Sequence, residues 1–319
     1  MSISYPKVGL LVAGAFVLFS VGFLLAQPSS RTADDQFTVT ATIFPLAEIA
    51  RAVGGDTVAV VTLVPPGVEA HDYTPGVREL VSAAQSEVFL TVGAGFDGWA
   101  DETALAVTQG GGFSVVASAQ VDLLASEELD HHDDEGAEEH HHEGGQDPHF
   151  WLDPVRMMVL VPKIEQIFIV ADPENAALYR ANSEAYMAEL LALHTAYETQ
   201  LATCENSEIV VTHDAYSYLA SRYAFSTHAI LGLSPEDEPS VGELADLTQF
   251  IREEGVTTLF FEEAAGQSLA QTLVNEVGVT PAVLSPLENV TTEQSTAGAT
   301  YTSVMRNNLE ALTQALVCQ

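Results

Sequence analysis

The stretch from Glu174 to Thr203 contains no proline and no glycine, and it restricts the possible folds of this chain more than any other segment. Asp172 and Pro173 precede it, and they are typical of a helix start because Asp can cap free N–H groups and Pro fits the first helical position. With a rise of 1.5 Å per residue, a helix over this stretch is roughly 45 Å long. One small domain does not need such a helix, so we expect it to span two.

On both sides of this stretch, apolar runs with strand character alternate with helical patterns. The expected strands are 37–43, 57–64, 87–92 and 113–118 in the first half, and 208–213, 225–230, 257–262 and 280–285 in the second. The expected helices are 45–53, 77–84, 97–108, 154–170, 215–223, 241–254, 267–277 and 296–317. This alternation predicts an α/β fold with parallel sheets. We expect two lobes, residues 37–170 and 205–319, joined by one long rigid helix within residues 171–204.

Residues 126–147 form a second unusual segment, called here the acidic histidine segment. It has ten acidic residues, no Lys or Arg, and the five histidines His131, His132, His140, His141 and His142. Its few apolar side chains cannot offset the entropy of ordering, so we expect a flexible loop. Histidine-rich tracts are typical of metal binding. The alternative is a solvated acidic loop whose histidines are incidental.

The charge balance excludes several classes of partner. The chain has 45 acidic and 10 basic residues, which gives a formal net charge of −35. Nucleic acids and anionic membrane surfaces bind basic patches, so neither is expected as a partner. A cationic ligand is electrostatically favoured.

The N-terminus carries an uncharged, mostly apolar run over residues 8–26, preceded by Lys7. Residues 1–27 therefore form either a secretory signal peptide or an uncleaved membrane anchor, and residues 28–36 read as a tether. No cysteine lies nearby, so we expect no lipid-modified cysteine. In both cases the body of the protein is expected outside the cytoplasm.

The chain has two cysteines, Cys204 and Cys318. In an oxidising compartment an even pair favours one disulfide, which would tie the C-terminus to the end of the long helix. The alternative is two unrelated thiols.

Three histidines lie at or beyond the carboxyl ends of expected strands. His71 and His149 belong to the first lobe and His213 to the second, whereas Glu262 and Glu288 end or follow strands of the second lobe. Ligands of parallel α/β sheets bind at this edge, so we expect a metal site in the cleft between the lobes. Imidazole nitrogens suit Zn²⁺, with a carboxylate as a plausible fourth ligand.

Other polar and aromatic side chains are judged by their position. His194 lies inside a helix and His228 inside a strand, so both are expected to be structural. Near the three candidate ligands, one or more of the neighbouring aspartates is expected to accept the second ring N–H of a histidine. Aromatic neighbours either shield the site or pack ordinarily. The aspartates are Asp72, Asp147 and Asp214, and the aromatic residues are Tyr73, Trp151 and Tyr216.

Four motifs resemble those of the zinc/manganese periplasmic binding proteins, which are solute receptors of ABC importers. The motifs are EAHDYTP at 69–75, DPHFWLDP at 147–154, THDAYSY at 212–218 and FFE at 260–262. The resemblance extends from about residue 37 to the C-terminus, and DPHFWLDP is its most specific part.

The resemblance implies metal ligands at His71, His149 and His213, and a histidine at the third position points to zinc. The fourth ligand is Glu288, Glu69 or water, with Glu288 preferred, although LSPLENV around it differs from common versions of that segment. Glu262 is implied as a neighbour of the ligands. The acidic histidine segment is similar to the loop of zinc receptors, which implies additional weak sites there.

The function implied by the resemblance is capture of Zn²⁺ outside the cell and delivery to a membrane ABC permease, without catalysis. A monomer is implied, with the N-terminal segment as a membrane tether if it is not cleaved. One alternative is a manganese-type receptor or an adhesin-like surface protein of the same family. An alternative from another class is a zinc-dependent hydrolase, against which stands the absence of an HExxH helix.

Overall fold

The computed structural model describes residues 1–2, 37–125, 145–233, 241–262, 274 and 277–319. Contacts divide the chain into the units Met1–Asp35 and Gln36–Gln319, and the described helices and strands lie in the second unit. No described helix is both long enough and apolar enough to cross a membrane. The expected N-terminal apolar run, most of the acidic histidine segment and most of the expected helix 267–277 lie outside the described residues.

The first lobe is built on a parallel sheet with strand order β2-β1-β3-β4. Its strands are β1 (Phe37–Ala41), β2 (Val58–Thr62), β3 (Val88–Thr91) and β4 (Phe113–Val116), and its helices are α1 (Phe44–Gly54), α2 (Val77–Ala83) and α3 (Asp101–Gln109). The central strands β1 and β3 are almost wholly buried, as expected for a parallel sheet covered on both faces.

The second lobe repeats this arrangement with strand order β6-β5-β7-β8. Its strands are β5 (Glu208–Val211), β6 (Ser226–Ala229), β7 (Thr258–Phe261) and β8 (Thr280–Val283), and its helices are α6 (Ser217–Tyr223), α7 (Val241–Glu254), α9 (Thr292–Thr296) and α10 (Tyr301–Ala315). Two α/β lobes with parallel sheets are thus confirmed. Both lobes share one topology, and the strands of each parallel sheet end at one edge, where ligands bind.

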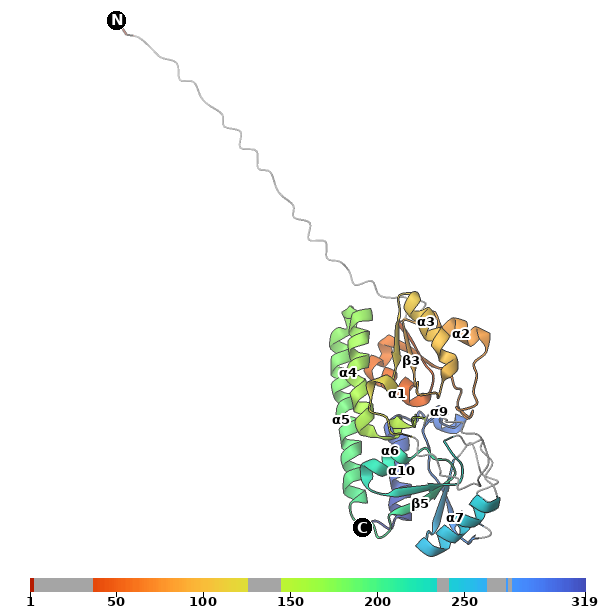
Figure 1. Cartoon of the computed structure of the whole chain (residues 1–319). Coiled ribbons are helices and arrows are strands. Elements are labelled where there is room, and N and C mark those ends of the chain that lie inside the picture. Colours follow the sequence, from red (N-terminus) through yellow and green to blue (C-terminus); the bar gives the residue numbers. More distant parts are fainter. Residues whose placement is uncertain (3–36, 126–144, 234–240, 263–273, 275–276) are drawn as a thin grey trace. The chain divides into compact units, whose positions relative to one another are not determined.

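The expected long helix is present as α5 (Ala176–Leu201), which pairs with α4 (Pro154–Ala171) along its length. Figure 1 shows α5 in green, running beside both lobes, and it packs on α1 of the first lobe and on α6 and α10 of the second. Its 26 residues rise about 39 Å. A single helix packed against both lobes holds them together as a rigid strut.

The start of α5 differs from the sequence expectation. Pro173–Asn175 form a 3-10 turn, and the residue that precedes α5 is Asn175 rather than Asp172. The Asp172 carboxylate instead accepts hydrogen bonds from Asn175 Nδ2 at 2.7 Å and Tyr179 Oη at 2.6 Å. Asp172 therefore stabilises the turn between α4 and α5.

The expected final helix over residues 296–317 begins later, as α10 (Tyr301–Ala315), and the short helix α9 (Thr292–Thr296) before it was not expected. Gly298 has φ +76°, a left-handed conformation that ends α9. Thr300 then caps α10 by accepting a hydrogen bond from the backbone N–H of Ser303 at 3.2 Å. The sequence pattern placed the start of this helix too early because a glycine and a threonine are also tolerated inside helices.

Cys204 and Cys318 form a disulfide, as expected. It joins the residues just after α5 and just after α10, and the two cysteines also form a backbone bridge. The chain end is thereby fixed to the second lobe. In the chain-entropy model, a disulfide that closes a loop of this length contributes about 4–5 kcal/mol.

Direct hydrogen bonds also join the lobes. Trp151 Nε1 donates to the Pro286 carbonyl at 2.7 Å, and Tyr218 Oη donates to the Asp147 carbonyl at 2.6 Å. Arg222 of α6 contacts the fully buried carboxylate of Asp153, the residue before α4, at 2.7 Å. These contacts fix the strand-end loops of one lobe against those of the other.

Candidate metal centre

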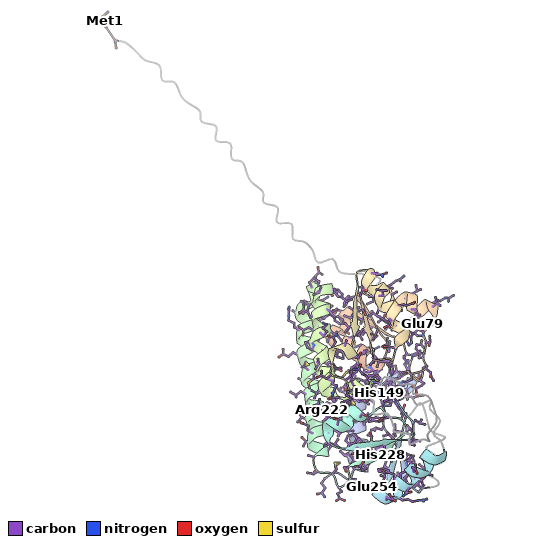
Figure 2. The ribbon with its side chains drawn as sticks, in the orientation of Figure 1. Met1, Glu79, His149, Arg222, His228 and Glu254 are labelled. Atoms are coloured by element: carbon purple, nitrogen blue, oxygen red, sulfur yellow. A yellow bond between two sulfur atoms is a disulfide. The ribbon has the colours of Figure 1, made fainter. Side chains whose placement is uncertain are left out.

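Four side chains from both lobes bring their donor atoms together between the sheets. His71 follows β2, His149 lies between β4 and α4, His213 follows β5 and Glu288 follows β8. One donor atom from each lies within 4.8 Å of the others. Figure 2 places His149 where the two lobes meet. The three histidines that the sequence placed after separate strands therefore converge. Glu288, one of the two carboxylates considered as the fourth ligand, lies with them.

The distances among these atoms fit one small cation. Glu288 Oε1 is 3.0 Å from His71 Nε2, 3.2 Å from His149 Nε2 and 3.6 Å from His213 Nε2. His149 Nε2 is 3.3 Å from Nε2 of both His71 and His213. Ligands bound tetrahedrally at the usual zinc distances of about 2.0–2.2 Å lie about 3.3–3.6 Å apart. Small adjustments would therefore allow the four donors to coordinate Zn²⁺.

The orientation of His149 is fixed by Asp147. Asp147 Oδ1 accepts from the backbone N–H of His149 at 2.9 Å and contacts its ring Nδ1 at 2.8 Å. Both side chains are buried. Nδ1 thereby donates to Asp147, and Nε2 faces the other donors. The expectation that an adjacent aspartate orients a histidine is correct here.

His213 is oriented by a residue distant in sequence. Its Nδ1 forms a short hydrogen bond with the carboxylate of Glu262, which directly follows β7. The neighbouring Asp214 instead accepts a hydrogen bond from Ser217 at the start of α6. Glu262 thus has the role that sequence proximity suggested for Asp214, because pairing of β5 with β7 places their ends side by side.

His71 lies at the exposed edge of the group. Its side chain is 12% exposed, against 0% for His149 and His213 and 4% for Glu288. No described residue forms a hydrogen bond with its Nδ1. The Glu69 carboxylate accepts from the His71 backbone N–H at 3.2 Å and does not join the four donors. The Asp72 side chain is exposed and orients no ring among the described residues.

Burial and charge set the protonation of the site. Burial acts against a charged His149, but its hydrogen bonds with Asp147 and Glu288 raise the pKa of His149 to about 9. The pKa of Glu288 is lowered: burial opposes this, and hydrogen bonds from His149 and His71 outweigh it. Without a metal ion, His149 and Glu288 therefore form an ion pair, and an incoming cation must displace the proton of His149.

Near the site, the pKa of a second carboxyl group, Glu69, is shifted in the direction opposite to that of Glu288. Burial, followed by the charge of Glu288, raises the pKa of Glu69 to about 7. The pKa of His213 is raised as well: burial works against this, and the charge and hydrogen bond of Glu262 exceed it. Glu288 is thus the negatively charged group of the site and the histidines carry the positive charge. The ionised form of Glu69 is disfavoured because it would be a second negative charge beside Glu288.

Aromatic residues around the site fix the segment that carries Glu288. Tyr216 Oη donates to the Leu284 carbonyl at 2.7 Å, next to the Trp151 bond with Pro286. Both aromatic side chains are buried. Tyr73 differs, because its hydroxyl donates to Glu79 at 3.2 Å on the side of the first lobe. Trp151 and Tyr216 therefore position the Glu288 segment.

The sequence analysis missed Phe96, whose ring packs edge-on against His71 with centroids 4.7 Å apart. It also contacts Trp151 at 5.4 Å. A signal was available, since Phe96 lies shortly after β3, at the same sheet edge as the histidines.

The two histidines expected to be structural lie apart from the four donors. His194 contacts Tyr223 Oη at 3.1 Å and Glu198 at 3.4 Å. His228 contacts Glu208 at 2.9 Å and packs on Phe250. Figure 2 shows His228 away from His149, in the second lobe. The histidines of the acidic histidine segment lie outside the described residues.

Comparison with known proteins identifies relatives of this chain. The family described as "Zinc-uptake complex component A periplasmic" matches residues 39–315. The zinc-binding lipoprotein AdcA of Streptococcus pneumoniae is 35% identical over 97% of this chain and 60% of its own length. The high-affinity zinc uptake system protein ZnuA of Bacillus subtilis is 33% identical over 96% of each chain. The chain thus spans about three fifths of the first relative.

A solved structure agrees at the level of the fold. The crystal structure of the Zn(II)-bound ZnuA-like domain of Streptococcus pneumoniae AdcA superimposes with a TM-score of 0.74 and 32% identity, covering 88% of this chain and 99% of that domain. The family match covers most of the chain, from β1 to the end of α10. The chain therefore belongs to the zinc-uptake complex component A family of periplasmic proteins.

Proposed function

We propose that this protein captures Zn²⁺ outside the cytoplasm and delivers it to an ABC permease in the membrane. The observation that carries the proposal is the convergence of four buried or nearly buried donor atoms, which lie within 4.8 Å of one another and could hold one Zn²⁺ after small adjustments. The relatives are named for zinc binding and high-affinity zinc uptake, which supports zinc as the cargo. The family name supports a periplasmic location.

The proposed ligands are His71, His149, His213 and Glu288. Glu262 serves as the hydrogen-bond partner of His213, since its carboxylate is engaged with Nδ1 of that ring. Glu69 is not a ligand in this proposal, because a carboxyl with a pKa of about 7 is a poor anion beside Glu288. Three imidazoles and one carboxylate are a donor set that suits zinc better than manganese.

The same donor set argues for binding rather than catalysis. A catalytic zinc site keeps one coordination position open for water or substrate, whereas four protein ligands fill a tetrahedron. The donors are also held by groups fixed between two lobes, which suits a site that captures a bare ion. The protein is accordingly a receptor and not a zinc hydrolase.

The rest of the chain has roles that follow from the sequence. Residues 1–27 act as a signal peptide or membrane anchor and residues 28–36 as a tether. The body is a monomer, divided into lobes 37–170 and 205–319 by the connecting segment 171–204. The five histidines of the acidic histidine segment provide additional weak zinc sites. Contacts between the lobes and α5 restrict the lobes to small movements.

Zinc stoichiometry and affinity, measured by chelator competition, test this proposal. The intact chain and a variant without residues 126–145 are compared. We expect one tight site in both, with additional weak sites only in the intact chain. Loss of the tight site on deletion would mean that the acidic histidine segment supplies a primary ligand.

Competition between metals tests the identity of the cargo. Zn²⁺ is expected to displace Mn²⁺ from the tight site at equal concentrations, because imidazole favours zinc in the usual affinity order of divalent metals. Preference for Mn²⁺ would overturn the assignment. Turnover of an ester, peptide or phosphodiester by the zinc-loaded protein, lost on His149→Ala, would instead support a hydrolase.

A further inference from the structure

His71 lacks the hydrogen bond that orients the other two histidines. Asp147 holds His149 and Glu262 holds His213, each through Nδ1. His71 comes from a loop between β2 and α2, and no described carboxylate or carbonyl accepts from its Nδ1. Something else must set the angle of this ring if its Nε2 is to face Glu288 at 3.0 Å.

Among the aromatic side chains, Phe96 lies nearest to this ring. The rings of Phe96 and His71 meet at an interplanar angle of 62° with centroids 4.7 Å apart, the edge-on arrangement that aromatic pairs favour. Trp151 supports Phe96 from another side with centroids 5.4 Å apart, and Trp151 is itself fully buried. Phe96 is therefore fixed against the buried wall of the site while touching its exposed ligand.

The backbone that carries Phe96 is built to hold it there. Gly93, Ala94 and Gly95 all have positive φ, at 78°, 52° and 83°, so the chain turns sharply after β3. The buried Asp97 carboxylate closes the turn by accepting from the N–H groups of Val92 at 2.7 Å and Gly93 at 2.8 Å. A side chain at Gly93 would collide with Ser118 and Val116. A turn this constrained fixes the direction of Phe96.

We infer that Phe96 is a positioning residue that holds His71 in its ligating orientation and thereby sets the rate at which the bound ion leaves. This inference rests on the proposed zinc-binding function. His71 is the ligand with the most solvent access, so the ion exchanges by rotation of this ring away from Glu288. The ring of Phe96 must yield before His71 can turn. His149 and His213 stay in place because their carboxylate partners hold them.

The test is zinc release from the loaded protein into excess chelator, followed by stopped-flow, together with the association rate. Phe96→Leu keeps an apolar side chain and removes the ring. We expect release to be about five- to tenfold faster, the effect of losing one aromatic pair, with association changed by less than about twofold. Phe96→Tyr keeps the ring and is expected to release zinc within about twofold of the wild-type rate.

Two further variants separate positioning from general packing. Phe113→Leu removes another partly buried ring of the same lobe, in β4, and is expected to leave the release rate within about twofold. In a His71→Ala background, Phe96→Leu is expected to have no additional effect, because the ring that it positions is gone.

The inference is overturned if Phe96→Leu releases zinc at the wild-type rate, or if Phe96→Tyr releases it as fast as Phe96→Leu. It is also overturned if Phe113→Leu accelerates release as much as Phe96→Leu does. The same holds if Phe96→Leu still accelerates release in the His71→Ala background. A wild-type chain that binds no zinc would overturn the proposed function and this inference together. A wild-type chain that binds zinc tightly but is insensitive to Phe96 would overturn the inference alone.

Discussion

The metal centre has a buried part and an exposed edge, and they hold their histidines differently. In the buried part, His149 and His213 each have a carboxylate on Nδ1 and no solvent exposure. At the exposed edge, His71 lies on a loop and its ring touches Phe96. Burial and hydrogen bonds give the first pair a fixed geometry before any ion arrives, whereas a ring held by packing can move.

The buried part therefore mainly sets the affinity for the ion, and the exposed edge mainly sets the rate of ion exchange. Preformed ligands lose little entropy on binding, so the buried part is suited to tight capture. Its carboxylates also raise the pKa of the histidines, so protons compete with the metal there. The exposed edge provides a way in and out. The following predictions test this comparison, beginning with the largest expected effect.

Removal of a buried ligand should cost more than removal of the exposed one. His149→Ala deletes a ligand and leaves Asp147 and Glu288 buried without their common partner. We expect zinc affinity to fall about a thousandfold, which is about 4 kcal/mol. His71→Ala should reduce it about a hundredfold, because water can replace an exposed ligand. Chelator competition measures both, with His194→Ala as the control. Equal losses of zinc affinity in His149→Ala and His71→Ala would contradict the distinction between the buried part and the exposed edge.

Removal of the carboxylate partners should weaken binding less. Asp147→Asn and Glu262→Gln keep side-chain size and abolish the negative charge that orients each ring and increases its basicity. We expect a loss of about 10- to 100-fold in zinc affinity for each variant. Glu208→Gln, which affects only the partner of His228, is the matched control and should bind like the wild type. Wild-type affinity in both site variants would show that packing alone orients the buried rings.

The pH dependence of affinity should reflect the buried part. The pKa of His149 is raised to about 9, so the metal-free protein carries a proton on this ring at neutral pH. Zinc must displace that proton, and affinity should rise about tenfold per pH unit between pH 7 and 9. Affinity that is flat from pH 7 to 9 would contradict a protonated His149. In Asp147→Asn, the pKa of His149 should be lower, so the rise in affinity should level off at a lower pH.

The smallest effect should come from Glu69. Its carboxyl lies outside the group of four donors, and its raised pKa leaves it partly neutral near pH 7. Glu69→Gln should therefore change zinc affinity by less than about threefold, the scale of a surface charge near the site. Glu288→Gln is the informative partner and should lose at least about a hundredfold. A larger loss of affinity in Glu69→Gln than in Glu288→Gln would indicate that Glu69 is the fourth ligand.

Much of this arrangement could be predicted because the relevant signals are local. Apolar runs of strand length and helical periodicity depend on neighbouring residues, so the eight strands and the long helix α5 were found from the sequence. Parallel strands end at one edge of a sheet, which placed His71, His149 and His213 together. Errors arose where a local signal was ambiguous, as at Gly298, which lies before the start of α10 and not inside the final helix.

The sequence by itself determined the two α/β lobes, the strut that joins them and the histidines at the strand ends. Only the tertiary structure decided which side chain orients which ring. Glu262, and not the adjacent Asp214, holds His213, because β5 pairs with β7 and brings together residues 49 positions apart. It also placed Glu288, and not Glu69, among the donors, and Phe96 against His71. These contacts depend on the strand order and on how the two lobes pack together. Neither can be read from a local pattern of residues.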